Sequence, residues 1–388
     1  MRRKFRYTSH VVKQQLLDVL NGAGIEVNGD QPWDIQVLDE RFWRRVALTR
    51  GIGFGDAYVD GWWTSKAVDE LVNRLLRHSR TVARGHFLHQ LWGSLVCQIF
   101  NLQRLSRAFQ VGERHYDIGN GLYRRMLGES MVYSCGYWDG GAATLEDAQR
   151  DKLELICRKI QLQPGMKVLD IGCGWGSFCK YAAENYQAEV VGVTVSRQQV
   201  AVAREACADL PVEIRLEDYR SLIGCFDRIV SIGMFEHVGP KNYRTFMDVA
   251  RRNLDPEGLF LLHTIGSNQS YGNSYTWLTR HIFPNGHIPS IAQIGRSIEE
   301  KFVMEDLHNF GVNYDRTLME WEARFRKAWP EIRRGSHMYD DRFYRMWRYY
   351  LLSCAGAFRA RHVQLWQWVL SPKGLTAGYK RPAFSALT

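Results

Sequence analysis

The sequence predicts an α/β protein with a doubly wound, mostly parallel sheet and a smaller helical domain before it. Short apolar runs in the centre of the chain alternate with stretches of helical spacing, a pattern typical of parallel strands joined by helices. The part up to about residue 112 shows helical spacing without such runs. The 388 residues are 45% hydrophobic and 24% charged, which suffices for two domains and excludes a disordered or collagen-like chain.

We predict a helical N-terminal domain over residues 1–105 and a second domain over residues 106–388. The apolar residues at helical spacing in the first domain are Leu16, Leu17 and Leu20, and then Leu71, Val72, Leu75 and Leu76. The glycines between these groups are Gly51, Gly53, Gly55 and Gly61. No strand precedes them, so they are interpreted as turns rather than as a phosphate-binding loop.

A basic segment without any acidic residue runs from Leu71 to Gly112. Its arginines are Arg74, Arg77, Arg80, Arg84, Arg104 and Arg107. Within it, apolar residues from Phe87 to Phe100 recur at helical spacing and form one broad face. Two interpretations stay open, a buried interdomain or dimer contact and a helix on a membrane surface. The net charge of +10 favours an anionic partner, either nucleic acid or an acidic membrane.

The N-terminus does not read as a secretory signal, because polar residues from Lys13 to Asp18 interrupt its apolar run. No window approaches the roughly eighteen apolar residues of a membrane span, so any membrane contact is expected to be peripheral. The eight cysteines form no Cys-x-x-Cys pair. We therefore expect no disulfide framework, no metal site and reduced thiols in a cytoplasm.

The predicted strands of the sheet are residues 167–171, 189–194, 226–232 and 258–263. The helical stretches between them include residues 197–208 and 243–254. Towards the C-terminus, a stripe from Phe343 to Cys354 is interpreted as a core helix, residues 363–370 as a final strand, and the residues after Ser371 as a loose tail.

The strongest local signal is a glycine-rich turn after the first predicted strand. The strand ends at Asp170, and Gly172, Gly174 and Gly176 then lead into a helix. Glycines let the backbone approach a ligand without an intervening Cβ, and the helix N-terminus offers free N–H groups. A dinucleotide fingerprint would need Gly or Ala in place of Ser177, which disfavours NAD. The turn predicts a different nucleotide-like ligand.

This acid-x-Gly-x-Gly-x-Gly form resembles the S-adenosylmethionine turn of class I methyltransferases. In most such enzymes the second strand ends in an acid that holds the ribose hydroxyls, whereas here it ends at Thr194. Thr194 and Gln199 are therefore expected to supply those hydrogen bonds. Asp218 and Tyr219 precede residues 226–232, where they would follow the third strand of a class I sheet and either meet the adenine or lie in a solvated loop.

Further segments carry a more specific resemblance. They are residues 111–120 (VGERHYDIGN), 133–138 (YSCGYW), 168–176 (VLDIGCGWG), 233–239 (GMFEHVG), 262–266 (LHTIG), 283–286 (FPNG) and 355–360 (AGAFRA). Together they resemble the cyclopropane-fatty-acyl-phospholipid synthases, in an order and spacing that run through nearly the whole chain. The resemblance implies a seven-stranded class I methyltransferase sheet, a lid insertion near residues 266–300, and contacts of Tyr133 and Ser134 with S-adenosylmethionine.

The resemblance also implies methylene transfer from S-adenosylmethionine to the cis double bond of unsaturated phospholipids, by a cytoplasmic homodimer peripheral on the inner face of an anionic membrane. An alkene is a poor nucleophile, so the methyl donor must be held in line and the resulting carbocation shielded from water. Aromatic rings can serve both needs. The aromatic residues in or beside the matched segments are Tyr116, Tyr133, Tyr137, Trp138, Phe235, Tyr271, Trp277, Phe283 and Tyr314.

Closure of a three-membered ring also requires a base. Glu236 and His263 follow or end predicted strands and are expected at the carboxyl edge of the sheet, where ligands bind. In the resembled family the base is a bound bicarbonate, which would be held by the side chains of Glu236, His263 and Tyr314 and by the backbone at Cys135 and Ile265. Beside bicarbonate, either Glu236 must be protonated or His263 charged. No step of this chemistry uses Cys135 as a nucleophile.

Two other classes of function compete with this hypothesis. A basic methyltransferase could act on nucleic acid, but base-methylating enzymes usually carry two adjacent prolines after the fourth strand, and this sequence has none. We therefore expect no nucleic-acid partner. A non-catalytic membrane scaffold would be expected to lose the glycine turn or the pair Glu236 and His263, and both are present.

Overall fold

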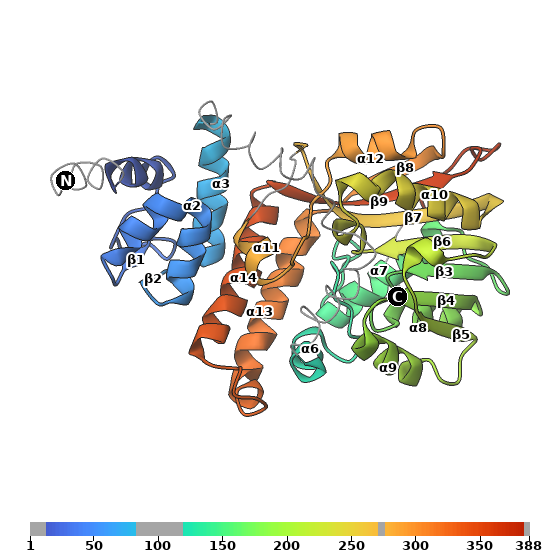
Figure 1. Cartoon of the computed structure of the whole chain (residues 1–388), viewed down its shortest axis with the longest axis horizontal. Coiled ribbons are helices and arrows are strands. Elements are labelled where there is room, and N and C mark those ends of the chain that lie inside the picture. Colours follow the sequence, from blue (N-terminus) through green and yellow to red (C-terminus); the bar gives the residue numbers. More distant parts are fainter. Residues whose placement is uncertain (1–12, 83–118, 271–275, 384–388) are drawn as a thin grey trace.

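A seven-stranded sheet is the centre of the computed structural model, which describes residues 13–82, 119–270 and 276–383 (Figure 1). The strand order is β5-β4-β3-β6-β7-β9-β8. The strands are β3 (Lys167–Ile171), β4 (Glu189–Thr194), β5 (Val212–Leu216), β6 (Phe226–Ile232), β7 (Leu254–Ser267), β8 (Val303–Asn309) and β9 (Val363–Ser371). β5, β4, β3, β6 and β7 are parallel, whereas β9 runs antiparallel to both β7 and β8. The predicted mostly parallel sheet is confirmed.

Helices cover both faces of this sheet, because its strands carry apolar side chains on both faces. On one face pack α7 (Leu145–Lys159), α8 (Ser177–Tyr186) and α9 (Arg197–Ala206). On the other pack α10 (Tyr243–Asn253) and α12 (Ile291–Ile298). After β3 the chain adds β4 and β5 on one side and then returns to place β6 on the other, so a topological switch point lies between β3 and β6. A ligand site is expected there.

The N-terminal part is mainly helical, as predicted, with a helix over residues 13–22 followed by α2 (Arg41–Val59) and α3 (Val68–Val82). A small antiparallel pair, β1 (Gln36–Val37) and β2 (Trp63–Thr64), joins them. The interpretation of the glycines as turns is wrong for Gly51, Gly53 and Gly55, which lie inside α2, kinked at Arg50 (φ 50°, ψ −126°). Only Gly61, with φ +75°, follows the helix end.

Two long C-terminal helices connect the N-terminal part to the sheet. They are α13 (Val312–Ile332) and α14 (Asp341–Arg359), and one hydrophobic core unites them with α2, α3 and α6 (Asn120–Leu127). The predicted core stripe is confirmed, since Phe343, Trp347 and Leu351 of α14 are buried. Arg359 of α14 pairs with Asp69 (2.7 Å) and Asp315 (2.9 Å) and so ties three helices together.

The segment after Ser371 is not loose as far as residue 383, which corrects the sequence-based prediction. It lacks regular secondary structure, but its side chains bind the protein body. The Tyr379 hydroxyl donates to the Lys159 carbonyl (2.9 Å), and Arg381 pairs with Asp306 (2.5 Å). The side chains of Tyr379 and Arg381 thus anchor a segment that was predicted to be loose because it lacks a helix or strand pattern.

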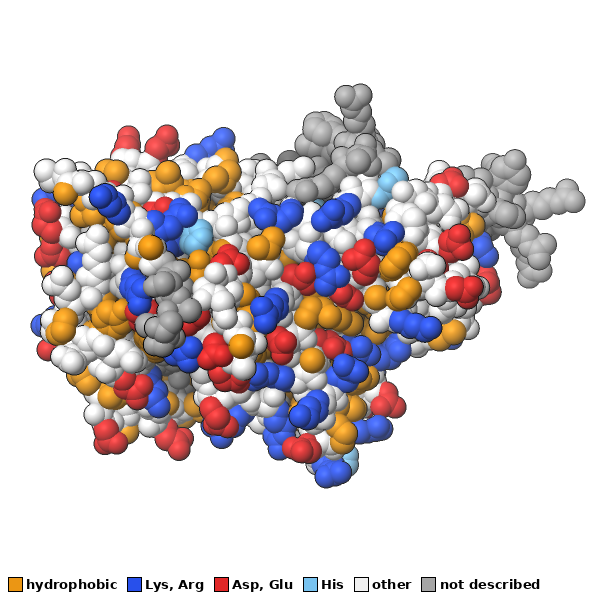
Figure 2. All heavy atoms as spheres, turned by 180° about the vertical axis from the view of Figure 1, so that it is seen from behind, with side chains coloured by type: hydrophobic (Ala, Val, Ile, Leu, Met, Phe, Trp, Pro, Cys, Tyr) orange, Lys and Arg blue, Asp and Glu red, His pale blue; other side chains and the backbone are white. Residues whose placement is uncertain are grey.

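Some predictions cannot be compared with this fold. The apolar face from Phe87 to Phe100, the arginines after Arg80 and the boundary between residues 105 and 106 lie outside the described residues. Within the described ranges, no helix combines the length and apolar character needed to cross a bilayer. On the face seen from behind, basic side chains alternate with acidic ones rather than forming one field (Figure 2).

Candidate active site

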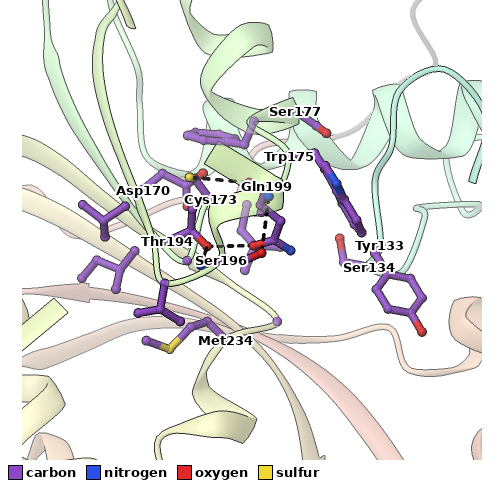
Figure 3. A pocket seen from close by; sticks show the side chains of 18 of the residues that line it. Tyr133, Ser134, Asp170, Cys173, Trp175, Ser177, Thr194, Ser196, Gln199 and Met234 are labelled. Carbon is purple, nitrogen blue, oxygen red and sulfur yellow. Dashed lines mark hydrogen bonds between the residues drawn. The ribbon is translucent and has the colours of Figure 1, made fainter. Parts of the chain in front are cut away.

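A pocket opens at the switch point, over the carboxyl ends of β3, β4 and β6 (Figure 3). It contains nearly all of the predicted cofactor-binding residues. These are Tyr133, Ser134, Asp170, Gly172, Gly174, Thr194, Gln199, Asp218 and Tyr219. Tyr133, Ser134 and Trp175 lie on one side of the pocket, with Asp170, Thr194 and Met234 on the other. Gly176 is the exception, because it caps the N-terminus of α8 without lining the pocket.

The three glycines of the turn all have left-handed backbone, with φ of +90°, +56° and +81°. A Cβ on Gly172 would lie 2.6 Å from the Met234 side chain, and one on Gly176 would lie 3.0 Å from Ala203. A Cβ on Gly174 would meet no protein atom within 4 Å and would enter the space of the pocket. Gly172 and Gly176 therefore permit close packing, whereas Gly174 leaves room for a ligand.

The hydroxyl and the amide that are predicted to hold the ribose contact each other. Thr194 Oγ1 donates to Gln199 Oε1 (2.7 Å), and both residues are buried. Ser196 caps α9 by accepting from the Gln199 N–H, which fixes the amide at the end of β4. Asp218 also lines the pocket, but its carboxylate binds Arg220 through Nε (2.8 Å) and Nη2 (3.0 Å). Its contact with adenine stays a prediction.

Two buried ionisable groups, Asp170 and Lys152, line the same pocket. Burial raises the pKa of Asp170 to about 7, against the opposing charge of Lys152, and its Oδ1 has no hydrogen-bond partner among the described residues. Burial likewise lowers the pKa of Lys152 to about 7. Lys152 Nζ donates to Ser134 Oγ (2.9 Å). The sequence analysis missed Lys152, because an isolated lysine on an amphipathic helix is usually solvated.

The segment 133–138 brings Tyr133 and Ser134 to the pocket because α13 and α7 hold its backbone. The Gly136 N–H donates to Thr317 Oγ1 (3.1 Å), and the Trp138 N–H donates to Asn313 Oδ1 (2.5 Å). Gln149 of α7 donates to the Ser134 carbonyl (2.8 Å). The position of this segment therefore depends on helices far apart in the sequence.

Glu236 and His263 lie at the carboxyl edge of β6 and β7, as predicted. Glu236 Oε1 accepts the Ile265 N–H (2.6 Å), and burial raises the pKa of this carboxyl to about 7. His263 is 1% exposed, and burial, with help from Lys152 and Lys159, lowers its pKa well below the usual value. Glu236 Oε2 and His263 Nε2 are buried and have no partner among the described residues.

The protonation of this pair follows from its contacts. Gln367 lies opposite His263 in the β7–β9 pairing and donates through Nε2 to His263 Nδ1 (3.2 Å). A neutral imidazole that accepts at Nδ1 carries its proton on Nε2. A neutral Glu236 that accepts at Oε1 carries its proton on Oε2. Both unpartnered atoms are then hydrogen-bond donors, and buried donors without a partner favour an anion.

The remaining predicted catalytic residues are Cys135, Tyr314 and Ile265, and of these Tyr314 and Ile265 lie near Glu236. Cys135 is fully buried, and burial raises the pKa of its thiol, which donates to the Gly136 carbonyl (3.1 Å). It is therefore no thiolate nucleophile. Burial, together with the nearby Cys135 and Glu236, raises the pKa of Tyr314. The Ile265 N–H is already donated to Glu236, so this group positions the acid instead of facing an open site.

We call Glu236 and His263, together with Tyr314, the acid cluster. A continuous series of aromatic rings runs from the pocket to Tyr314 in this cluster. Ring centroids of successive pairs are 5.0 to 6.0 Å apart, in the order Trp175, Tyr123, Tyr133, Trp321 and Tyr314. Of the predicted aromatic residues, Tyr133 and Tyr314 belong to it. Tyr123 and Trp321 were missed, because their place in the wall depends on how α6 and α13 pack.

Other predicted aromatic residues serve different purposes. The Tyr133 hydroxyl shares a hydrogen bond with that of Tyr350 (2.8 Å), whose ring packs 5.5 Å from Phe283. Phe235 instead stacks on Tyr243 in the core. Tyr116 and Tyr271 lie outside the described residues.

The segment predicted to contain a lid, residues 266–300, contacts both the acid cluster and the N-terminal part. The His287 N–H donates to the Glu236 carbonyl (2.8 Å). In α11 (Trp277–His281), Trp277 Nε1 donates to Asp56 of α2 (3.1 Å), and His281 bonds the same carboxylate (2.8 Å). A lid movement of this segment stays a prediction.

The sheet order, the left-handed glycine turn at the switch point and the adjoining hydroxyl–amide pair define an S-adenosylmethionine-dependent methyltransferase of the class I fold. An orphaned carboxyl oxygen on Asp170 and the open space beside Gly174 fit the amino-acid end of that cofactor. Residues 103–368 match the sequence model of the family described as mycolic acid cyclopropane synthetase, and the chain belongs to this family.

Individual relatives agree with this assignment. The chain is 51% identical over 363 residues to cyclopropane-fatty-acyl-phospholipid synthase of Escherichia coli (strain K12), covering 94% of each protein. It is 32% identical to cyclopropane mycolic acid synthase 2 of Mycobacterium leprae, covering 69% of this chain and 95% of that one. Among solved structures, the cyclopropane synthase MmaA2 of Mycobacterium tuberculosis is similar with a TM-score of 0.64 and 29% identity, over 70% of this chain and 99% of that one.

A further solved structure is the mycolic acid cyclopropane synthase CmaA1 complexed with SAH and CTAB. It is similar with a TM-score of 0.62 and 30% identity, over 68% of this chain and 97% of that one. Coclaurine N-methyltransferase, at 22% identity and a TM-score of 0.68, supports the fold alone.

Proposed function

We propose that this protein transfers a methylene group from S-adenosylmethionine to the cis double bond of unsaturated phospholipid acyl chains and so forms cyclopropane fatty acids. The observation that carries this proposal is the pair of buried, unpartnered polar atoms on Glu236 and His263, joined to the cofactor pocket by a wall of aromatic rings. The high identity to a protein named cyclopropane-fatty-acyl-phospholipid synthase supports the choice of substrate.

The residues of the pocket bind and orient the methyl donor. When bound, S-adenosylmethionine supplies an electrophilic methyl group on a sulfonium. Thr194 and Gln199 would hold the ribose, and the open side of Gly174 admits the methionine part. Tyr133 and Trp175 cover the pocket and exclude water from the line of attack.

The aromatic wall serves the reacting lipid. Attack of the alkene on the methyl carbon breaks the bond from that carbon to sulfur and leaves a positive charge on the acyl chain. The ring faces of Tyr133, Trp321 and Tyr314 stabilise such a charge and keep water away from it. Acyl chains also pack favourably on this apolar surface.

A bound bicarbonate would act as the base. The ring closes when the transferred methyl group loses a proton, because the electron pair of that C–H bond then forms the bond to the cationic carbon. A bicarbonate held by Glu236 and His263 would supply the base for that proton. Neutral Glu236 and His263 would each donate one hydrogen bond to this anion, and the buried lysines Lys152 and Lys159 add positive potential near His263. The Ile265 N–H would act indirectly, by holding Glu236.

Membrane contact belongs to the same proposal. The phospholipid substrate lies in the bilayer, so we place the protein in the cytoplasm, peripheral on the inner face of an anionic membrane and as a homodimer. The acid-free segment from Leu71 to Gly112 supports this, since each basic residue near an anionic surface contributes about 1 kcal/mol. Arg77 also donates to the Arg359 carbonyl within the fold, so replacing it would disturb that contact as well, and the test below replaces Arg80 and Arg84.

Charge reversal of these two arginines tests the membrane contact. Arg80→Glu with Arg84→Glu should weaken binding to anionic vesicles and activity on them, while activity on detergent-dispersed lipid persists. The opposing interpretation, a buried dimer or interdomain contact, predicts normal vesicle binding with an altered sedimentation coefficient or melting temperature.

The test of the reaction itself uses methyl-labelled S-adenosylmethionine with vesicles of unsaturated phospholipid. We expect label in the lipid and acyl chains heavier by one CH₂. Vesicles of saturated phospholipid are the matched control, and tRNA replaces lipid to test the nucleic-acid alternative. Label in tRNA but not in lipid would refute the proposal. Full activity after removal of bicarbonate would refute only the assignment of the base.

A further inference from the structure

Lys152 is buried in a place where a lysine is costly. It lies on α7, is 1% exposed and lines the cofactor pocket. Its ammonium donates to the neutral hydroxyl of Ser134 (2.9 Å), and no carboxylate of the described residues lies within ion-pair distance of it. A buried ammonium without a counter-charge is strongly disfavoured, as the lowering of its pKa to about 7 reflects. The pocket thus contains a buried lysine without a counter-charge among the described residues.

The same pocket contains a buried acid, one oxygen of which lacks a hydrogen-bond partner in the described part of the chain. Asp170 is 2% exposed at the end of β3, and its Oδ1 has no partner within the described ranges. Lys152 and Asp170 are near enough to influence each other's pKa but form no ion pair. A ligand with both a carboxylate and an ammonium would satisfy both groups, and the α-amino-acid end of S-adenosylmethionine is such a ligand.

We propose that Lys152 recognises the α-carboxylate of the methionine part of S-adenosylmethionine, with Ser134 holding its ammonium in place between turnovers. This inference rests on the proposed function, since it requires that cofactor. On binding, Lys152 exchanges a hydroxyl partner for a carboxylate, and such charge-assisted hydrogen bonds are the stronger kind. Asp170 is then left to the ammonium end of the same ligand.

The alternative is a lysine that serves only the packing of α7, and the chain contains a matched example. Lys159 is on the same helix, two turns later, and is 0% exposed. Its Nζ bonds His308 Nδ1 (2.9 Å) and lies 3.8 Å from Asp306. It does not line the cofactor pocket. Replacing Lys159 therefore removes a buried lysine without touching the ligand.

The test compares S-adenosylmethionine with its decarboxylated analogue, which lacks only the carboxylate. Calorimetry would measure both affinities for the wild type, Lys152→Met and Lys159→Met. We expect the wild type and Lys159→Met to bind the analogue about 10- to 100-fold more weakly than the full cofactor, the range of a hydrogen bond to a charged group. Lys152→Met should bind the two ligands with nearly equal affinity, because its preference for the carboxylate is gone.

Each other outcome has a defined meaning. If Lys152→Met keeps the wild-type preference for the carboxylate, or the wild type binds both ligands equally, the inference is overturned. If the wild type binds neither ligand, the proposed function itself fails. Thermal melting checks the fold of each variant, and Lys152→Gln, which keeps a polar group beside Ser134, replaces Lys152→Met if the latter does not fold.

Discussion

The open space beside Gly174 permits a direct test of the cofactor pocket with a single methyl group. Gly174→Ala adds a Cβ that meets no protein atom within 4 Å but enters the pocket. Gly165→Ala is the matched control, because Gly165 also has a left-handed backbone (φ +78°) and nothing within 4 Å, yet is exposed in the turn before β3. The two variants share the backbone strain and differ only in what the new methyl group faces.

The expected magnitudes follow from that geometry. A residue other than glycine in left-handed backbone costs about 1–2 kcal/mol, so both variants should lose similar stability. Only Gly174→Ala places its methyl group against the ligand, where overpacking costs about 1–3 kcal/mol. This corresponds to about a 5- to 150-fold loss of affinity for S-adenosylmethionine. The larger Gly174→Val should abolish binding while the protein still folds.

Calorimetric titration with S-adenosylmethionine and thermal melting together give the answer. The expected result is an equal fall in melting temperature for both alanine variants and a fall in affinity for Gly174→Ala alone. If a folded Gly174→Ala variant bound the cofactor as tightly as Gly165→Ala, the assignment of this pocket would be refuted.

Four further predictions concern the acid cluster and the contact with the N-terminal part. Glu236→Gln and His263→Ala should each lower turnover by about a hundredfold or more with little change in cofactor affinity, since both act on the base rather than the cofactor; an equal loss of affinity would argue for a general disruption of the site. The proposed bicarbonate base requires a protonated Glu236, and burial raises the pKa of this carboxyl to about 7. Activity at fixed bicarbonate concentration should therefore fall as pH rises through about 7, and a profile that stays flat there would contradict this protonation state. The contribution of the Glu236 carboxyl to folding stability also falls with rising pH, because the pKa of this carboxyl is raised on folding. The contribution is fully present below about pH 4.5 and is lost as pH rises through about 7. Unfolding of the wild type and of Glu236→Gln at a series of pH values measures it. Gly55→Ala should loosen the contact of α2 with α11, because its Cβ would lie 2.5 Å from the Trp277 ring, whereas Gly51→Ala, with nothing within 4 Å, should leave melting temperature and activity near wild type.

The sequence predicted the strands that form the centre of the sheet because each contains a short apolar run. The prediction for residues 167–171, 189–194 and 226–232 agrees with β3, β4 and β6 residue for residue. The edge strand β8 was missed because its sequence, VMEDLHN, is half exposed and has no apolar run. An edge strand has little to bury on its outer side, so its pattern is weak.

The residues of the candidate site also fall into two groups, those that the sequence could place and those that it could not. Residues adjacent to a strand end, such as Asp170, Thr194 and Glu236, could be placed from sequence because the topology fixes where a parallel strand ends. Lys152 and Tyr123 could not be placed, because their side chains reach the site only through the packing of α7 and α6. The occupation of the Ile265 N–H by Glu236 depends on atomic positions that no spacing reveals.

The position of β9 has a consequence for the order in which the enzyme is assembled during synthesis. Every residue that lines the cofactor pocket lies between Met131 and Val238, well before β9 in the chain. The His263 imidazole, by contrast, obtains its Nδ1 partner from Gln367, on a strand that inserts between β7 and β8. A ribosome-bound chain could therefore complete the cofactor half of the site while the reacting half still lacks a strand. Premature termination before β9 would yield a protein whose tautomer at His263 is undefined, so that the methyl donor is held without the means to finish the ring.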